Sequence, residues 1–127
     1  MLQEGSASIV KEVETTRINN RHIEIMIFHD GRAVALSSKA IGIYRDRDAV
    51  LDPLGNGLIN LVDMPKEYCF QEDDAPWIQA HQAGFVKLHK ELSLLILPND
   101  IRLYRNNDDA LRNTNPIISI PFDIHAE

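Results

Sequence analysis

An Asp-Gly pair between two apolar segments is the feature that most constrains this chain. Residues 22–29 alternate strictly, with Ile23, Ile25 and Ile27 on one face and Glu24, Met26 and Phe28 on the other. A period of two with β-branched residues is typical of a strand with at least one buried face. Asp30-Gly31 favours a two-residue type I′ turn, because both central residues of that turn need a positive φ. Residues 32–37 are the expected return strand of an antiparallel hairpin.

Further short strands are predicted on both sides of this hairpin. Apolar alternation favours strands at residues 40–44, 58–62, 94–97, 101–105 and 117–124, the last with Pro121 at a sheet edge or bulge. Residues 7–16 fit a strand or a helix, and their Val, Ile and Thr content favours the strand. The sum is about seven short strands, and we detect no internal repeat.

One helix is predicted between Pro76 and Leu92. Pro76 suits the first helical position, and the preceding Asp73 and Asp74 suit a cap. An apolar stripe at helical spacing follows, comprising Trp77, Ala80, His81, Gly84, Phe85, Leu88 and Leu92. Gly84 is unfavourable inside a helix, so it marks a close backbone approach.

The fold class that follows is α+β in one globular domain, residues 1–127. Hairpin-linked strands argue for a curved, mostly antiparallel sheet or a partly open barrel. The single apolar stripe of the predicted helix then packs on one face of that sheet.

Composition narrows the function classes. Thirteen Lys and Arg stand against 19 Asp and Glu, for a formal charge of -6, which disfavours duplex nucleic acid as a partner. The single cysteine, Cys69, excludes an internal disulfide framework. No apolar run reaches the ~18 residues of a membrane span, and the first residues lack the pattern of a signal peptide. We therefore expect a cytoplasmic protein.

No residue set has the spacing of a known catalytic or metal site, and no cofactor is expected. Asp46, Asp48 and Asp52 lack the Gly and Glu of a calcium loop. Glu72, Asp73 and Asp74 are best explained as capping the predicted helix. The histidines are too widely spaced to share an ion.

The leading functional hypothesis is a small binding or protein-interaction domain. A pocket between helix and sheet would take a small apolar ligand, with a lining of Tyr44, Tyr68, Trp77, His81 and Phe85. The alternative is a hydrolase or isomerase in which His81 is the general base and Asp63 orients it.

Protein partners are the other expectation. Arg102, Tyr104 and Arg105 on the second predicted hairpin are residue types that anchor protein interfaces. Free sheet edges also favour a homodimer. A third hypothesis is an inhibitor or immunity-type partner of a basic protein, with an acidic face of Asp46, Asp48, Asp52 and Glu72 to Asp74.

Overall fold

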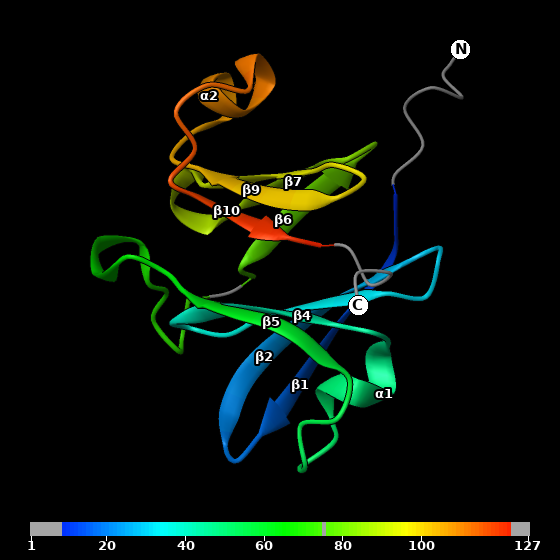
Figure 1. Ribbon diagram of the computed structural model, residues 1–127. Helices are drawn as coiled ribbons and strands as arrows, with labels where there is room; N and C mark the ends of the chain where they lie inside the picture. The colour runs from blue at the N-terminus through cyan, green and yellow to red at the C-terminus, as the bar shows by residue number, and fades with distance from the viewer. Residues whose placement is uncertain (1–8, 75, 123–127) are drawn as a thin grey trace. The chain divides into compact units, whose positions relative to one another are not determined.

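The computed structural model describes residues 9–74 and 76–122, which divide into two compact units. The N-terminal unit is Val10–Asp74, and the C-terminal unit is described for residues 9 and 76–122. Each unit holds one five-stranded antiparallel sheet (Figure 1). The prediction of a single globular domain stays a prediction.

The N-terminal unit is a simple up-and-down meander with strand order β1-β2-β3-β4-β5. One short helix separates its last two strands. The elements are β1 (Val10–Ile18), β2 (Arg21–Phe28), β3 (Ala33–Leu36), β4 (Ala40–Tyr44), α1 (Arg47–Val50), β5 (Leu58–Asp63) and the 3-10 turn η2 (Lys66–Tyr68). Residues 10–16 are thus a strand, as their composition favoured, and residues 7–8 lie outside the described part.

The C-terminal unit repeats this order. Its elements are β6 (Ile78–Gln82), β7 (Phe85–Leu88), the 3-10 turn η3 (His89–Glu91), β8 (Ser93–Ile96), β9 (Asp100–Tyr104), α2 (Asn107–Arg112) and β10 (Ile118–Pro121). The described residues therefore form ten strands and two short α-helices. The α+β class with mostly antiparallel sheet is confirmed, but the prediction of about seven strands was wrong. In the described residues neither sheet closes into a barrel, because its first and last strands form opposite edges.

The predicted helix Pro76 to Leu92 is wrong. This segment forms the β6–β7 hairpin, with Gln82 opposite Phe85 and Ala83 at φ 56 in the turn. The chain turns again at η3, where Lys90 and Glu91 also have positive φ. Good helix formers occupy these positions, but pairing of β7 with β8 overrides local propensity. The close backbone approach expected at Gly84 is present, since its carbonyl accepts from the Ile96 N–H at 2.7 Å.

The two units are copies of one structural pattern, and the same shift in residue number relates their second, third and fourth strands. Pairing of β2 with β3, in which Ile25 faces Ala35, recurs as Phe85 facing Leu95 in β7 and β8. The β3–β4 register recurs residue for residue in β8–β9. The first hairpin differs in length, yet both copies carry a bulge at the same place, between Val10/Glu12 and between Ile78/Ala80. A repeat is therefore present that we did not detect in the sequence.

The helices of the two copies begin in the same way. The side chains of Asp46 and Asn106, which occupy equivalent positions, accept the N–H of Ala49 and Asp109, both at 2.8 Å. Each side chain satisfies a backbone donor that the helix itself cannot. Helix α1 packs on β3 and β4, and α2 packs on β8 and β9. Asp46 and Asp48 thus lie at the start of a helix.

Alternation sorts the side chains of the N-terminal sheet onto two faces. On the α1 side, Ile25, Ala33, Ala35 and Val50 form a buried cluster. The residues between them point to the other face, where Met26, Phe28, Val34, Leu36, Ile41 and Ile43 are fully buried. The facing predicted for residues 23–28 is confirmed. The Asp30-Gly31 turn is longer than predicted, because β2 and β3 close with Ile27 opposite Ala33 and only Gly31 has positive φ.

Candidate functional site

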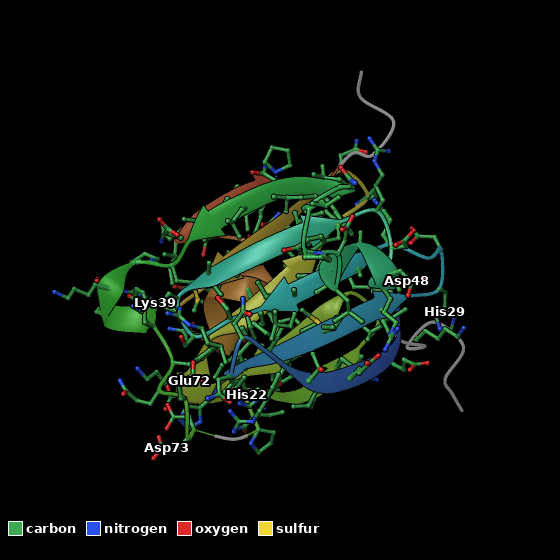
Figure 2. All side chains as sticks on the ribbon, turned by 90° about the horizontal axis from the view of Figure 1, so that it is seen from below. His22, His29, Lys39, Asp48, Glu72 and Asp73 are labelled. Carbon is green, nitrogen blue, oxygen red and sulfur yellow. The ribbon has the colours of Figure 1, made fainter. Side chains whose placement is uncertain are left out.

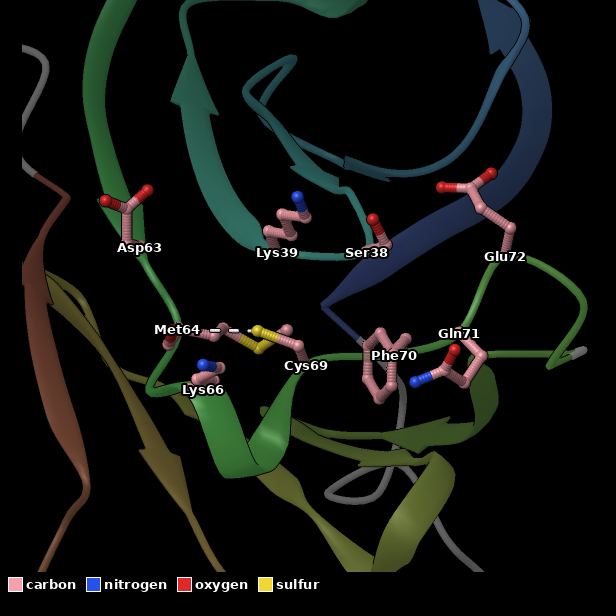
Figure 3. A pocket seen from close by; sticks show the side chains of 9 residues that line it. All are labelled: Ser38, Lys39, Asp63, Met64, Lys66, Cys69, Phe70, Gln71 and Glu72. Atoms are coloured by element: carbon pink, nitrogen blue, oxygen red, sulfur yellow. Dashed lines mark hydrogen bonds between the residues drawn. The ribbon is translucent and has the colours of Figure 1, made fainter.

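A pocket of about 700 Å³ lies at one end of the N-terminal sheet. It forms where the β3–β4 turn meets the end of β5 and the segment that follows β5 (Figure 3). Its lining consists of Ser38, Lys39, Asp63, Met64, Lys66, Cys69, Phe70, Gln71 and Glu72. The volume is in the range typical of small-molecule sites.

Two backbone hydrogen bonds hold the walls of this pocket together. The Met64 N–H donates to the Lys39 carbonyl and the Phe70 N–H to the Ser38 carbonyl, both at 2.8 Å. The first continues the β4–β5 ladder, in which Ala40 faces Asp63. The second returns the chain to the same turn after η2. Met64 and Phe70 are buried, at 4% and 3% exposure, and give the pocket an apolar floor.

The carboxylate of Glu72 is fixed on the pocket wall. Its Oε1 accepts the backbone N–H of His22 at 3.0 Å. This hydrogen bond, helped by one from the Ser38 hydroxyl, holds the pKa of Glu72 below its ordinary value. Glu72 is therefore an ionised, oriented carboxylate at neutral pH, and Figure 3 shows it beside Ser38.

A buried polar pair stands behind Glu72. His22 and Glu24 lie on β2, on the same face, and are 8% and 2% exposed. The His22 Nε2 lies 2.9 Å from the Glu24 Oε2. Figure 2 shows His22 and Glu72 together at one end of the sheet, with His29 and Asp48 at the other end. The His22 backbone N–H joins β2 to the segment that carries Glu72.

The rim of the pocket carries two charges of each sign. Lys39 and Lys66 are exposed, and the structure gives their ammonium groups no ion pair with any residue it describes. Asp63 and Glu72 supply the carboxylates, and Figure 3 shows Lys39 between them. A molecule with an apolar body and one group of each charge can meet all of these features at once.

The thiol of Cys69 contributes to the pocket as a structural group. Its Sγ donates towards the carbonyls of Met64 at 3.8 Å and Pro65 at 3.6 Å. These contacts give Cys69 a structural role at the pocket.

Of the residues singled out in the sequence as pocket or catalytic candidates, only Asp63 lines this pocket. Tyr68 lies in η2 beside it, and Tyr44 lies on the α1 face of the same unit. The C-terminal unit holds the remaining candidates. There, His81 and Phe85 line a separate hollow of about 260 Å³, and Trp77 is fully buried. The pocket was predicted to lie between a helix over residues 76–92 and the sheet. That helix is absent, because the segment forms β6, β7 and η3.

The proposed pair of His81 and Asp63 belongs to two different units, on β6 and at the end of β5. Its catalytic role stays a prediction. Within residues 9–74 and 76–122, no three His, Cys, Asp or Glu side chains are grouped so that they could hold a metal ion.

The predicted interface residues lie at the end of β9. Arg102 donates to Asp100 and to Asn113, both at 2.8 Å. Tyr104 is fully buried and its hydroxyl contacts the same Asn113 side chain. Arg105 is exposed and pairs with Asp109 at 3.1 Å. All three side chains thus have partners inside the C-terminal unit, and the interface stays a prediction.

The acidic run Glu72 to Asp74 does not cap a helix as predicted. Asp74 instead closes a turn, in which its Oδ2 accepts the Gln71 N–H at 3.0 Å. Because Glu72 was interpreted as part of a helix cap, its place in the pocket was not predicted. The sequence did contain one signal for this site, the polar turn Ser37-Ser38-Lys39 between β3 and β4. Because β5 pairs antiparallel with β4, the residues that follow β5 lie beside that turn.

Comparison with known proteins identified no relative of this chain. No family model, no curated protein and no solved structure matches the chain. None of the helices in the described residues is long and apolar enough to cross a membrane.

Proposed function

We propose that the protein is a binding protein whose pocket in the N-terminal unit takes a small zwitterionic molecule with an apolar body. A short peptide with free ends has this chemistry. The observation that carries the proposal is the pocket rim, where Glu72 is fixed and ionised while Lys39 and Lys66 have no described ion-pair partner.

Each part of such a ligand meets a matching group. The ligand ammonium pairs with Glu72 and the ligand carboxylate with Lys39 or Lys66. An apolar side chain lies over Met64 and Phe70. Hydrogen bonds between charged groups are among the stronger contacts available to a small site. Pre-orientation of Glu72 by the His22 N–H lowers the entropy cost of binding.

The test is a calorimetric titration with the dipeptide Phe-Leu, with free ends or with both ends capped. The free form is expected to bind, and the capped form to bind at least about tenfold more weakly, because it has lost both charges. Lys39→Gln and Glu72→Gln should each weaken binding of the free form by about tenfold, because each removes one charge partner of the ligand.

Matched control variants separate the pocket from bulk charge. Lys11→Gln on β1 and Asp73→Asn next to Glu72 change the same charges outside the lining. They are expected to leave the affinity unchanged. Equal binding of the capped and free dipeptides, or equal losses in the control variants, would contradict the proposal.

A further inference from the structure

The two sheets have four edge strands in total, and three of them are protected against pairing with another strand. An exposed edge offers unpaired N–H and C=O groups, which charges, bulges and proline block. Strand β1 carries Lys11, Glu12, Glu14 and Arg17 and has a bulge. Strand β6 has a bulge between Ile78 and Ala80, and it presents the exposed Gln79 and Gln82 but no exposed large apolar side chain. Strand β10 ends in Pro121, which has no N–H to donate.

Strand β5 is different. Residues 58–62 (Leu-Ile-Asn-Leu-Val) contain neither charge nor proline, and Leu58 and Leu61 are 40% and 56% exposed. The strand has one irregularity at Ile59, which leaves the stretch from Asn60 to Asp63 in regular register with β4. Its only described strand partner is β4, so its outer edge is open within the described chain.

We propose that β5 pairs with β5 of a second copy of this chain. The pairing is antiparallel about a two-fold axis at Leu61 and joins the two N-terminal sheets into one. This inference does not depend on the ligand proposed above, although Asp63 places the second copy beside the pocket wall.

The position of the axis follows from side-chain chemistry. In a two-fold antiparallel pair, the residue on the axis faces itself and its neighbours face each other in order. An axis at Leu61 sets Leu61 against Leu61, Asn60 against Val62, and Asp63 against Ile59. The two Asp63 carboxylates are then four residues apart along the strand, or ~13 Å at ~3.3 Å per residue. An axis at Val62 would halve that separation, to less than the screening length of about 8 Å at physiological salt.

The repeat leaves β5 of a second copy as the partner strand, because the equivalent edge in the described C-terminal unit is closed to pairing. Leu61 faces Gly42 on β4, and the residue in the same place of the C-terminal unit is Ser119, which faces Arg102 on β9. The C-terminal edge is thus polar at that position and is blocked by Pro121 two residues later. With one open edge in the described part of each chain, assembly closes at a dimer instead of growing into a fibre.

The test is sedimentation equilibrium of the full chain, without added ligand, over a wide concentration range. The wild-type protein is expected to reach twice the chain mass of 14.4 kDa. Leu61→Lys places two like charges face to face across the axis and should raise the dissociation constant at least tenfold. Ser119→Lys is the matched control at the equivalent edge and should behave as wild type.

Three results would overturn the pairing. They are a monomer at every concentration, an undiminished dimer in Leu61→Lys, or the same loss in Ser119→Lys. Circular dichroism should show that Leu61→Lys remains folded, since that side chain is already largely exposed. Nuclear Overhauser contacts between Leu61 residues of labelled and unlabelled chains then identify the strand that pairs.

Discussion

Replacing Gly84 by alanine is expected to destabilise the C-terminal unit by about 2–3 kcal/mol. A β-carbon at this position would lie 2.7 Å from the Ile96 carbonyl oxygen, which belongs to the backbone at the end of β8. The Ile96 N–H also donates to the Gly84 carbonyl, so neither segment can move away without loss of a hydrogen bond. Urea unfolding followed by tryptophan fluorescence measures the change.

Whether Gly84→Ala lowers or raises the free energy of unfolding distinguishes a hairpin from a helix in this segment. In a helix over residues 76–92, the same substitution would stabilise the protein by about 1 kcal/mol, because alanine is the better helix former. The control is Ala83→Gly in the same turn. Ala83 has φ 56, where glycine carries no steric penalty, so this variant is expected to be neutral or stabilising. Stabilisation by Gly84→Ala would contradict the hairpin.

The two repeat-related tyrosines are expected to differ in their contribution to stability. Tyr104 is fully buried and its hydroxyl contacts Asn113 at the end of α2, so Tyr104→Ala should cost about 3–5 kcal/mol. Tyr44, at the equivalent position of the N-terminal unit, is only partly buried and lies over Gly42 at the sheet face. Tyr44→Ala should cost about 1–2 kcal/mol, in proportion to the smaller apolar area it covers.

Urea unfolding of the two alanine variants, with Tyr104→Phe as a third, measures this difference. The Phe variant keeps the ring and loses only the hydroxyl contact, for which about 1 kcal/mol is expected. Equal losses in Tyr44→Ala and Tyr104→Ala would show that the two copies bury this position to the same extent and would contradict the structure.

Strands with strict alternation could be predicted from the sequence. The segment around Ile23, Ile25 and Ile27 has its facing set by the alternating pattern, since a slip of one residue would move all three side chains to the opposite face of the sheet. The β8–β9 hairpin was found for the same reason. These are local signals, and the structure agrees with them.

The hairpin at Ala83 and Gly84 could not be predicted in this way. Its residues fit a helical stripe as well as they fit two short strands, and a short apolar segment does not distinguish the two. The decision comes from β8, which lies beside β7 only after the chain has turned at η3. Long-range pairing therefore decided the local structure.

The repeat escaped detection because only one part of it is similar in sequence. Between residues 40–51 and 100–111, the identical pairs are Ile41/Ile101, Tyr44/Tyr104, Arg45/Arg105, Asp48/Asp108 and Leu51/Leu111. The first hairpins share their bulge but have different lengths, so no single offset aligns them. Backbone geometry has been kept where side chains have changed.

The candidate site was the least predictable part of the molecule. Its walls come from the β3–β4 turn and from residues 63–72, which are brought together by β4–β5 pairing. Asp63 was considered only as a partner for His81. Glu72 was predicted to cap a helix that is absent from the structure. Its actual partner, the His22 N–H, is 50 residues away in the sequence. No local pattern encodes such a contact.

The repeat supports the proposed pairing of β5, and one measurement tests the repeat directly. Three-dimensional nuclear Overhauser spectroscopy of the labelled protein should show cross-strand contacts between Ile25 and Ala35 and, at the equivalent positions of the second copy, between Phe85 and Leu95. Strand-type chemical shifts should flank Ala83 and Gly84. Helical contacts three residues apart across residues 77–92, with no Phe85–Leu95 contact, would contradict the two-copy structure.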